Sequence, residues 1–230
     1  QLVESNVLCH AGLTDTASYV FRHALFQDVA YSSLLRRERE RLHSRIARML
    51  IRTVPGVAER EPEFIALHCA KGGLIEEAVD HWQTAAERSR QQSANSEVMH
   101  HVRNGLELLA GLPDTDENIR REMDLRIYLA LAIAALKGGG VPEVGENYSR
   151  ARQLIQAGSD RKTEFKILHG SWVYHFIGAD LHQASVLSTE MLEIANQIGD
   201  DALLVEANRA HGQTLLYQGE FAKSQLHIKS

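Results

Sequence analysis

One turn recurs along the chain and decides its fold: Gly140-Val-Pro-Glu-Val144, Ala179-Asp-Leu-His-Gln-Ala184 and Gly219-Glu-Phe-Ala-Lys-Ser224. Each copy has a small residue, an apolar residue within two positions, and a small or β-branched residue that opens a helix. The copies end at positions 144, 184 and 224, a period of 40. Such a period is typical of stacked helix pairs that bury their apolar faces against one another. We therefore predict an all-α fold, a superhelical stack of antiparallel helix pairs.

Amphipathic helices joined by short breaks occupy the chain from residue 62 onward. The breaks hold residues that end or begin helices, such as Gly199, a C-terminal glycine, followed by Asp200, an N-cap. Trp82 and Trp172 are expected in the core between helices, because large aromatic side chains dominate burial. The apolar spacing predicts helices at 62–72, 75–92, 95–110, 116–137, 142–157, 162–178, 181–198, 201–218 and 220–230.

The composition agrees with a helical protein that has a core of its own. The 230 residues include only 4 prolines, and 6% aromatic residues are too few for a typical β-sandwich core. Cys9 and Cys69 form no CxxC pair, which is typical of a reduced cytoplasmic protein with inert thiols. No apolar run approaches the ~20 residues that span a membrane, and no signal-peptide pattern opens the chain. We therefore expect a cytoplasmic protein without a membrane partner.

The first 55 residues differ from the rest. Tyr19-Val20-Phe21 is a short β-favouring run, and residues 24–35 then show apolar residues at helical spacing. A second helix begins near residue 35 and ends at Pro55-Gly56. Its apolar residues form one stripe that we expect to face a core: Leu42, Ile46, Met49 and Leu50.

Two parts of the sequence resemble known families. The turn Gly73-Leu-Ile-Glu-Glu-Ala78, with Trp82 and Ala85 after it, resembles the tetratricopeptide repeat. The run Phe21-Arg-His-Ala-Leu-Phe-Gln-Asp-Val-Ala-Tyr31, with Arg41-Leu-His43 after it, is similar to one junction in bacterial adenylate/guanylate cyclase-like proteins. That junction closes their AAA/STAND-type ATPase module, just before the helical repeats.

The resemblance implies two regions and a regulatory role. Residues 1–55 would end a winged-helix-like, ATPase-associated module, and residues 56–230 would be tetratricopeptide-like repeats, incomplete at the C-terminus. The chain would be a protein- or peptide-binding scaffold, the sensor arm of a multidomain cyclase-like ATPase in signal transduction. It would contact the upstream ATPase and cyclase domains within the same polypeptide.

The two ends of the chain carry a further expectation. The chain starts at Gln1 rather than Met and stops inside an unfinished helical pattern, so we expect it to be part of a longer protein. The helix at 220–230 would then expose Phe221, Leu226 and Ile228, which the next repeat would cover. We therefore predict self-association through this end.

The sequence shows no residue pattern for catalysis. Gly140-Val-Pro-Glu-Val-Gly145 has the glycine spacing of a phosphate loop but continues with Glu146 and Asn147, whereas a P-loop ends in Lys-Ser/Thr. The 12 histidines include no pair three or four residues apart, the spacing that places two metal ligands on one helix face. We expect no catalytic, cofactor-binding or metal-binding residue in this chain, and therefore no enzyme activity of its own.

A concave groove is one candidate surface for a partner. In stacked helix pairs, the first helix of each pair lines this groove. Plain packing between repeats is the other interpretation, especially for Val173 and Leu216. The predicted groove residues are Lys166, His169, Val173, Phe176, Glu206, Arg209, Gln213 and Leu216.

A basic helix is the second candidate surface. Residues 36–52 include seven arginines, among them Arg36, Arg37, Arg41 and Arg45, and carry a net charge of +5, which leaves −10 for the remainder. An arginine-rich helix beside a winged-helix-like segment could contact DNA, as in a transcriptional regulator whose repeats sense a ligand or partner. Interleaved glutamates and the lack of Asn or Gln on this helix favour a solvated or internally docked helix instead. No nucleic-acid partner is therefore expected.

Overall fold

The computed structural model describes residues 8–10, 19–156 and 159–228, which hold two short strands and twelve helices. The elements are β1 (Leu8–His10), β2 (Tyr19–Phe21), α1 (Ala24–Ser33), α2 (Arg36–Thr53), α3 (Val57–Arg60), α4 (Pro62–Lys71), α5 (Ile75–Gln91), α6 (Asn95–Leu109), α7 (Asp116–Lys137), α8 (Pro142–Gln153), α9 (Arg161–Ile177), α10 (Leu181–Ile198), α11 (Asp201–Tyr217) and α12 (Phe221–Ile228).

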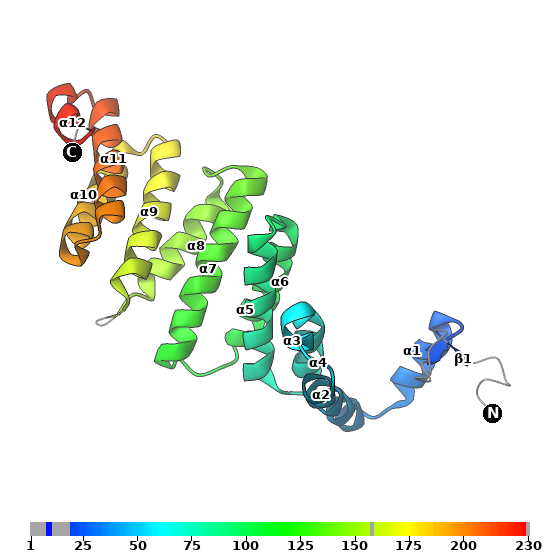
Figure 1. Cartoon of the computed structure of the whole chain (residues 1–230). Helices are drawn as coiled ribbons and strands as arrows, with labels where there is room; N and C mark the ends of the chain where they lie inside the picture. Colours follow the sequence, from blue (N-terminus) through cyan, green and yellow to red (C-terminus); the bar gives the residue numbers. More distant parts are fainter. Residues whose placement is uncertain (1–7, 11–18, 157–158, 229–230) are drawn as a thin grey trace.

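Consecutive helices pack against each other from α4 to α12, so the chain forms a line of helix pairs (Figure 1). In addition, α5 contacts α7, α7 contacts α9, and α9 contacts α11. We call these four helices the row. The predicted all-α stack of consecutive helix pairs is thus confirmed, and the row provides a continuous surface along it.

Buried residues explain why the recurring turn has a period of 40. Val144, Ala184 and Ser224 occupy the third or fourth position of α8, α10 and α12, and all three are buried. Ala78 and Val98 hold the fourth position of α5 and α6 and are buried too. A small or β-branched residue here lets the first turn of each helix approach its neighbour closely.

Aspartate N-caps define the starts of the last helices. Asp160, Asp180 and Asp200, spaced every 20 residues, each accept hydrogen bonds from backbone N–H groups in the first turn of α9, α10 and α11. Gly199 ends α10 with a φ of 68°, a left-handed conformation that suits glycine. These caps are why the predicted bounds of α10 are the observed ones.

The core is a series of clusters between neighbouring helices, as expected for a repeat protein. Trp82 and Trp172 are both buried, which confirms their predicted place in the core. Several helices end one residue before the predicted position, and α8 ends four residues before it, at Gln153 rather than at residue 157. Residues 157–158 lie outside the described part. The four-residue α3 was not predicted, because it is too short to show a period.

The N-terminal segment packs less extensively than the repeats. Strands β1 and β2 pair antiparallel, with Leu8 opposite Phe21, and α1 has no buried residue. Helix α2 packs on α4 at Ala47. A Cβ atom on Gly72, at the end of α4, would lie 2.5 Å from the backbone nitrogen of Ser44. The two backbones therefore meet where only glycine fits.

One expectation for α2 is wrong. Leu42 and Met49 were predicted to face a core with Ile46 and Leu50, but both are exposed. Helix α4 covers only one side of α2, so Ile46 and Leu50 are partly buried while the flanking residues are not. Among the described helices, none has both the length and the apolar content to cross a bilayer.

Candidate partner-binding surface

An ion pair and a histidine–carboxylate contact join neighbouring helices of the row. Between α5 and α7, Arg121 Nη2 lies 2.6 Å from Asp80 Oδ1. Between α9 and α11, His169 Nε2 lies 2.7 Å from Glu206 Oε1. These contacts hold polar side chains of different repeats in one fixed arrangement on the surface of the row.

The structure brings four of the predicted groove residues together. Arg209 forms an ion pair with Glu206, and its Nη1 donates a hydrogen bond to Gln213 Oε1 at 3.0 Å. Its guanidinium carbon also lies 5.6 Å from the centre of the Trp172 ring. We call His169, Glu206, Arg209 and Gln213 the groove cluster.

Burial and charge set the protonation of the groove cluster. Burial lowers the pKa of His169, and the opposing effect of Glu206 is smaller. The hydrogen bond from Arg209 lowers the pKa of Glu206. At neutral pH the cluster therefore holds an anionic carboxylate between a neutral imidazole and a guanidinium. His169 Nε2 is buried and forms no well-aligned hydrogen bond among the described residues.

Phe176 lies beyond the groove cluster in an aromatic group. Its ring stacks on Trp172 and meets Tyr217 edge-on, with centroids 5.1 Å apart in both pairs. Val173 is partly buried against the core cluster that contains Trp172, whereas Leu216 is exposed. The packing interpretation thus holds for Val173 but not for Leu216.

Lys166 does not join the groove cluster. It is exposed on α9, and its charge acts on Asp124 of α7. Burial raises the pKa of Asp124, and Lys166 partly opposes that shift. Lys166 therefore belongs to the α7 side of the row.

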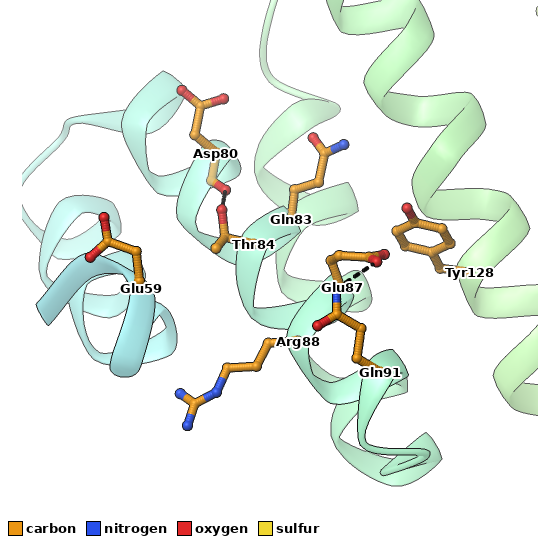
Figure 2. Close-up of a pocket in the computed structure, with 8 residues that line it drawn as sticks. All are labelled: Glu59, Asp80, Gln83, Thr84, Glu87, Arg88, Gln91 and Tyr128. Carbon is orange, nitrogen blue, oxygen red and sulfur yellow. Dashed lines mark hydrogen bonds between the residues drawn. The ribbon is translucent and has the colours of Figure 1, made fainter. Parts of the chain in front are cut away.

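A hollow lined by polar side chains lies on the row between α3, α5 and α7 (Figure 2). Its volume is about 560 Å³. Figure 2 shows α5 side chains along its floor, with Glu59 of α3 and Tyr128 of α7 on opposite sides. The lining residues are Glu59, Asp80, Gln83, Thr84, Glu87, Arg88, Gln91 and Tyr128.

Glu87 organises the wall of this hollow beside Tyr128. Arg90 donates to both of its carboxylate oxygens, at 2.9 and 2.6 Å, and Gln91 Nε2 donates at 3.1 Å. The hydrogen bonds, first that from Arg90, lower the pKa of Glu87 to about 2. Burial, and then Glu87, raise the pKa of Tyr128 to about 12. The sequence places Arg90 three residues after Glu87, a spacing that allows the two to pair on one helix face. It does not indicate that Tyr128 lies beside Glu87.

The predicted basic helix, α2, presents one stripe of exposed arginines. These arginines recur every three or four positions, which places them on one side of α2, away from the buried Ala47. Arg36, predicted with them, pairs with Glu40 at 2.9 Å. In the part of the chain that the structure describes, no carboxylate pairs with the stripe residues Arg37, Arg41, Arg45, Arg48 and Arg52.

Two histidines join α2 to α4. His43 Nδ1 lies 2.9 Å from His68 Nδ1, and His43 Nε2 lies 3.0 Å from Tyr31 Oη of α1. Phe64 covers the His68 ring edge-on. Only one of the two Nδ1 atoms can carry a hydrogen in this contact, so at least one of the rings must be neutral.

We expect acid to loosen α2 from α4. Burial lowers the pKa of both rings, and Lys71 lowers each further, as His43 also does for His68. Released rings, with a pKa of about 6.5, bind more protons than docked ones, so docking weakens as the pH falls through that value. Amide hydrogen exchange in α2, corrected for its intrinsic pH dependence, should be faster at about pH 5.5 than at about pH 7.5.

The matched control for this prediction is His68→Gln, which removes the second titrating ring. Its α2 exchange should change much less with pH, while exchange in α10 should be the same in both proteins. Equal pH dependence of α2 in wild type and variant would contradict the role of the histidine pair.

No group of three or more His, Cys, Asp or Glu side chains in the described residues is placed to hold a metal ion. Cys69 is buried, with 1% of its surface exposed. Burial, and then Glu77, raise its pKa to about 11, so the thiol stays protonated at neutral pH. The side chain of Cys9 lies outside the described residues.

The chain matches no family model and no solved structure. It is similar to an uncharacterized protein of Rhizobium meliloti (strain 1021), with 25% identity over 205 residues. The match covers 85% of this chain and 19% of that protein. The chain thus spans about a fifth of the length of the curated relative that it matches.

Proposed function

We propose that the chain is a non-catalytic, partner-binding scaffold, a tetratricopeptide-like superhelix that serves as the sensor arm of a longer signalling protein. The observation that carries this proposal is the row, whose polar side chains are held in place by pairs between repeats. Side chains that are already ordered lose little conformational freedom when a peptide binds. The partner is a protein or peptide, in the cytoplasm.

The longer protein is, on this proposal, an adenylate/guanylate cyclase-like ATPase, with residues 1–55 ending its winged-helix-like module. Two features support it: the junction motif around Phe21 to Tyr31, and a relative several times longer than the matched region. Partner binding on the row would favour one arrangement of the upstream domains and so change their activity.

The test compares two arginine substitutions in the whole protein that contains this chain. Arg209→Gln removes the positive charge of the groove cluster, and Arg103→Gln removes an exposed positive charge on α6, outside the row. Cyclic-nucleotide formation in cells should change by about fivefold or more with Arg209→Gln, the range of ordinary coupling between sites. It should not change with Arg103→Gln. A whole protein that forms no cyclic nucleotide, or equal activity in both variants, would contradict the proposal.

A DNA-contacting role for α2 is the second candidate, favoured by the five exposed arginines of its stripe. Arginines on one helix face can neutralise successive phosphates, which makes binding strongly salt-dependent. Duplex binding that falls with salt and is lost in Arg41→Glu/Arg45→Glu would support a transcriptional regulator instead of a sensor arm.

The proposal includes self-association through the C-terminal end, as the sequence predicts. Phe221 and Leu226 are exposed on α12, with 67% and 75% of their surface accessible. The side chain of Ile228 lies outside the described residues. A second copy of the chain would cover these exposed apolar side chains.

A further inference from the structure

His101 is a titratable side chain buried between helices of the stack. It lies on α6, outside the row, and is 8% exposed. Its ring lies on the indole of Trp82 in α5, with the ring centroids 5.5 Å apart and an angle of 25° between the planes. Trp82 is itself 5% exposed. This stack is therefore one of the contacts that hold α6 against α5.

A glycine one turn further along α6 makes room for the stack. A Cβ atom on Gly105 would lie 3.5 Å from Trp82 Cβ and 3.3 Å from Leu125 Cδ1. The two helices can therefore approach closely at Gly105. His101 is four residues earlier on the same face of α6, which places its ring over the indole.

One ring nitrogen of His101 is buried without a partner. Its Nδ1 forms no hydrogen bond among the residues that the structure describes. A neutral imidazole can leave this nitrogen without a hydrogen, whereas a protonated imidazole carries a hydrogen on both nitrogens. The Nδ1–H group would then be charged, buried and without an acceptor, which costs more than the attraction of a cation to the indole face offsets. The stacked position therefore suits the neutral ring and not the charged one.

Three ionisable groups act on the His101 ring. Burial lowers the pKa of His101 and His100 lowers it further, whereas Glu63 of α4 and Glu97 of α6 oppose this shift. Helix α5 presents the uncharged indole. Neither carboxylate belongs to an ion pair within the described ranges, and Glu97 lies four residues before His101, on the same helix face. A protonated ring that leaves the indole therefore has an unpaired carboxylate within reach.

We infer that His101 is a pH-sensitive contact between α5 and α6. The neutral ring stays on Trp82 and holds the two helices together, whereas the protonated ring leaves the indole and turns toward Glu97. A released ring, with a pKa of about 6.5, binds more protons than the stacked one, so the contact weakens as the pH falls through that value. Because α5 belongs to the row, acid loosens the row at this helix. The inference does not depend on the proposed function.

Trp82 fluorescence tests the inference in the whole chain. The chain has 2 tryptophans, so Trp172→Phe leaves Trp82 as the reporter. Emission is followed from about pH 7.5 to about pH 4.5, and circular dichroism measures the helix content over the same range. We expect one transition in emission with a midpoint below about 6.5, at constant helix content, because the indole loses its stacked neighbour. Amide hydrogen exchange in α6, corrected for its intrinsic pH dependence, should become faster over the same range.

Substitutions at the two adjacent histidines make the result specific. His101→Phe keeps a ring on Trp82 that cannot titrate, and His101→Gln removes the ring, so neither variant should show the transition. His100→Gln is the matched control, because His100 is exposed and meets the indole edge-on at 6.0 Å, and it should keep the transition. Glu97→Gln should lower the midpoint by about 0.2–0.4 pH units, the size of an ordinary pair four residues apart.

A further control separates this contact from the histidine pair between α2 and α4. His68→Gln, which removes a ring of that pair, should leave the Trp82 transition in place. A transition that persists in both His101 variants, or that disappears in His100→Gln, would overturn the inference. So would an emission that does not change with pH, or that changes only together with the helix content.

Discussion

Replacing Trp172 with Ala is expected to lower the free energy of unfolding by about 3–5 kcal/mol. The indole is 3% exposed and lies in the core between α9, α10 and α11. Its Nε1 donates to Thr214 Oγ1 at 2.9 Å, and Phe176 stacks on its ring. The substitution removes this packing, leaves a cavity and deprives a buried hydroxyl of its donor.

Urea unfolding followed by circular dichroism measures this effect, with Trp172→Phe as the control. Phenylalanine retains most of the ring packing and loses the hydrogen bond, so its cost should be smaller, about 1–2 kcal/mol. Trp82 remains as a fluorescent reporter of the N-terminal repeats in both variants. A loss below about 1 kcal/mol for Trp172→Ala would contradict the place of this indole in the core.

Replacing Gly170 with Ala is expected to destabilise the protein by about 1–3 kcal/mol. Ala is normally more favourable than Gly inside a helix by up to about 1 kcal/mol, so the expected sign is the reverse of the usual one. The new Cβ atom would lie 2.0 Å from Tyr148 Cζ. Tyr148 is buried against Gly170 and cannot move aside without disturbing α8.

Two comparisons isolate the close approach at Gly170. Gly111→Ala, in the turn after α6, is the control without a close approach, since its Cβ atom would have no neighbour closer than 3.5 Å, and it should change stability by less than about 0.5 kcal/mol. In the double variant with Tyr148→Ala, Gly170→Ala should cost much less, because the clash is gone. Gly170→Ala that stabilises the wild type would show that α8 and α9 do not pack as described.

The sequence predicted most of the repeat architecture, because glycines, prolines and aspartates mark the helix ends. Gly199 and Asp200 place the end of α10 and the start of α11, and the bounds of α7 are those predicted. Val144 and Ala184 were recognised as equivalent positions from spacing alone. Local residues suffice for these features, since helix caps act within one turn.

Contacts between repeats could not be predicted in the same way. Arg152 pairs with Glu190 and Lys162 with Asp200, both 38 residues apart, because the stacking sets which helix faces meet. The groove residues were assigned by helix face. This assignment does not predict which neighbouring helix a flexible side chain such as Lys166 will face.

The sequence also could not predict which individual apolar residues of a helix are exposed. Leu42 and Met49 fit an amphipathic pattern, yet a helix with one neighbour buries only the residues facing it. The hollow beside Glu87 and Tyr128, and the contact of His43 with His68, join residues of separate helices. Neither the hollow nor the histidine contact produces a periodic pattern in the sequence from which it could be predicted.

Site-specific photo-crosslinking in cells tests the central claim, that the row is the partner-binding face. A photoreactive amino acid is placed at Gln213 or Gln83 on the row, and at Glu193, an exposed residue of α10 outside it. The account predicts that both row positions crosslink to the same discrete protein or to an upstream domain, and that position 193 does not. Crosslinks of equal yield from all three positions, or from position 193 alone, would contradict it.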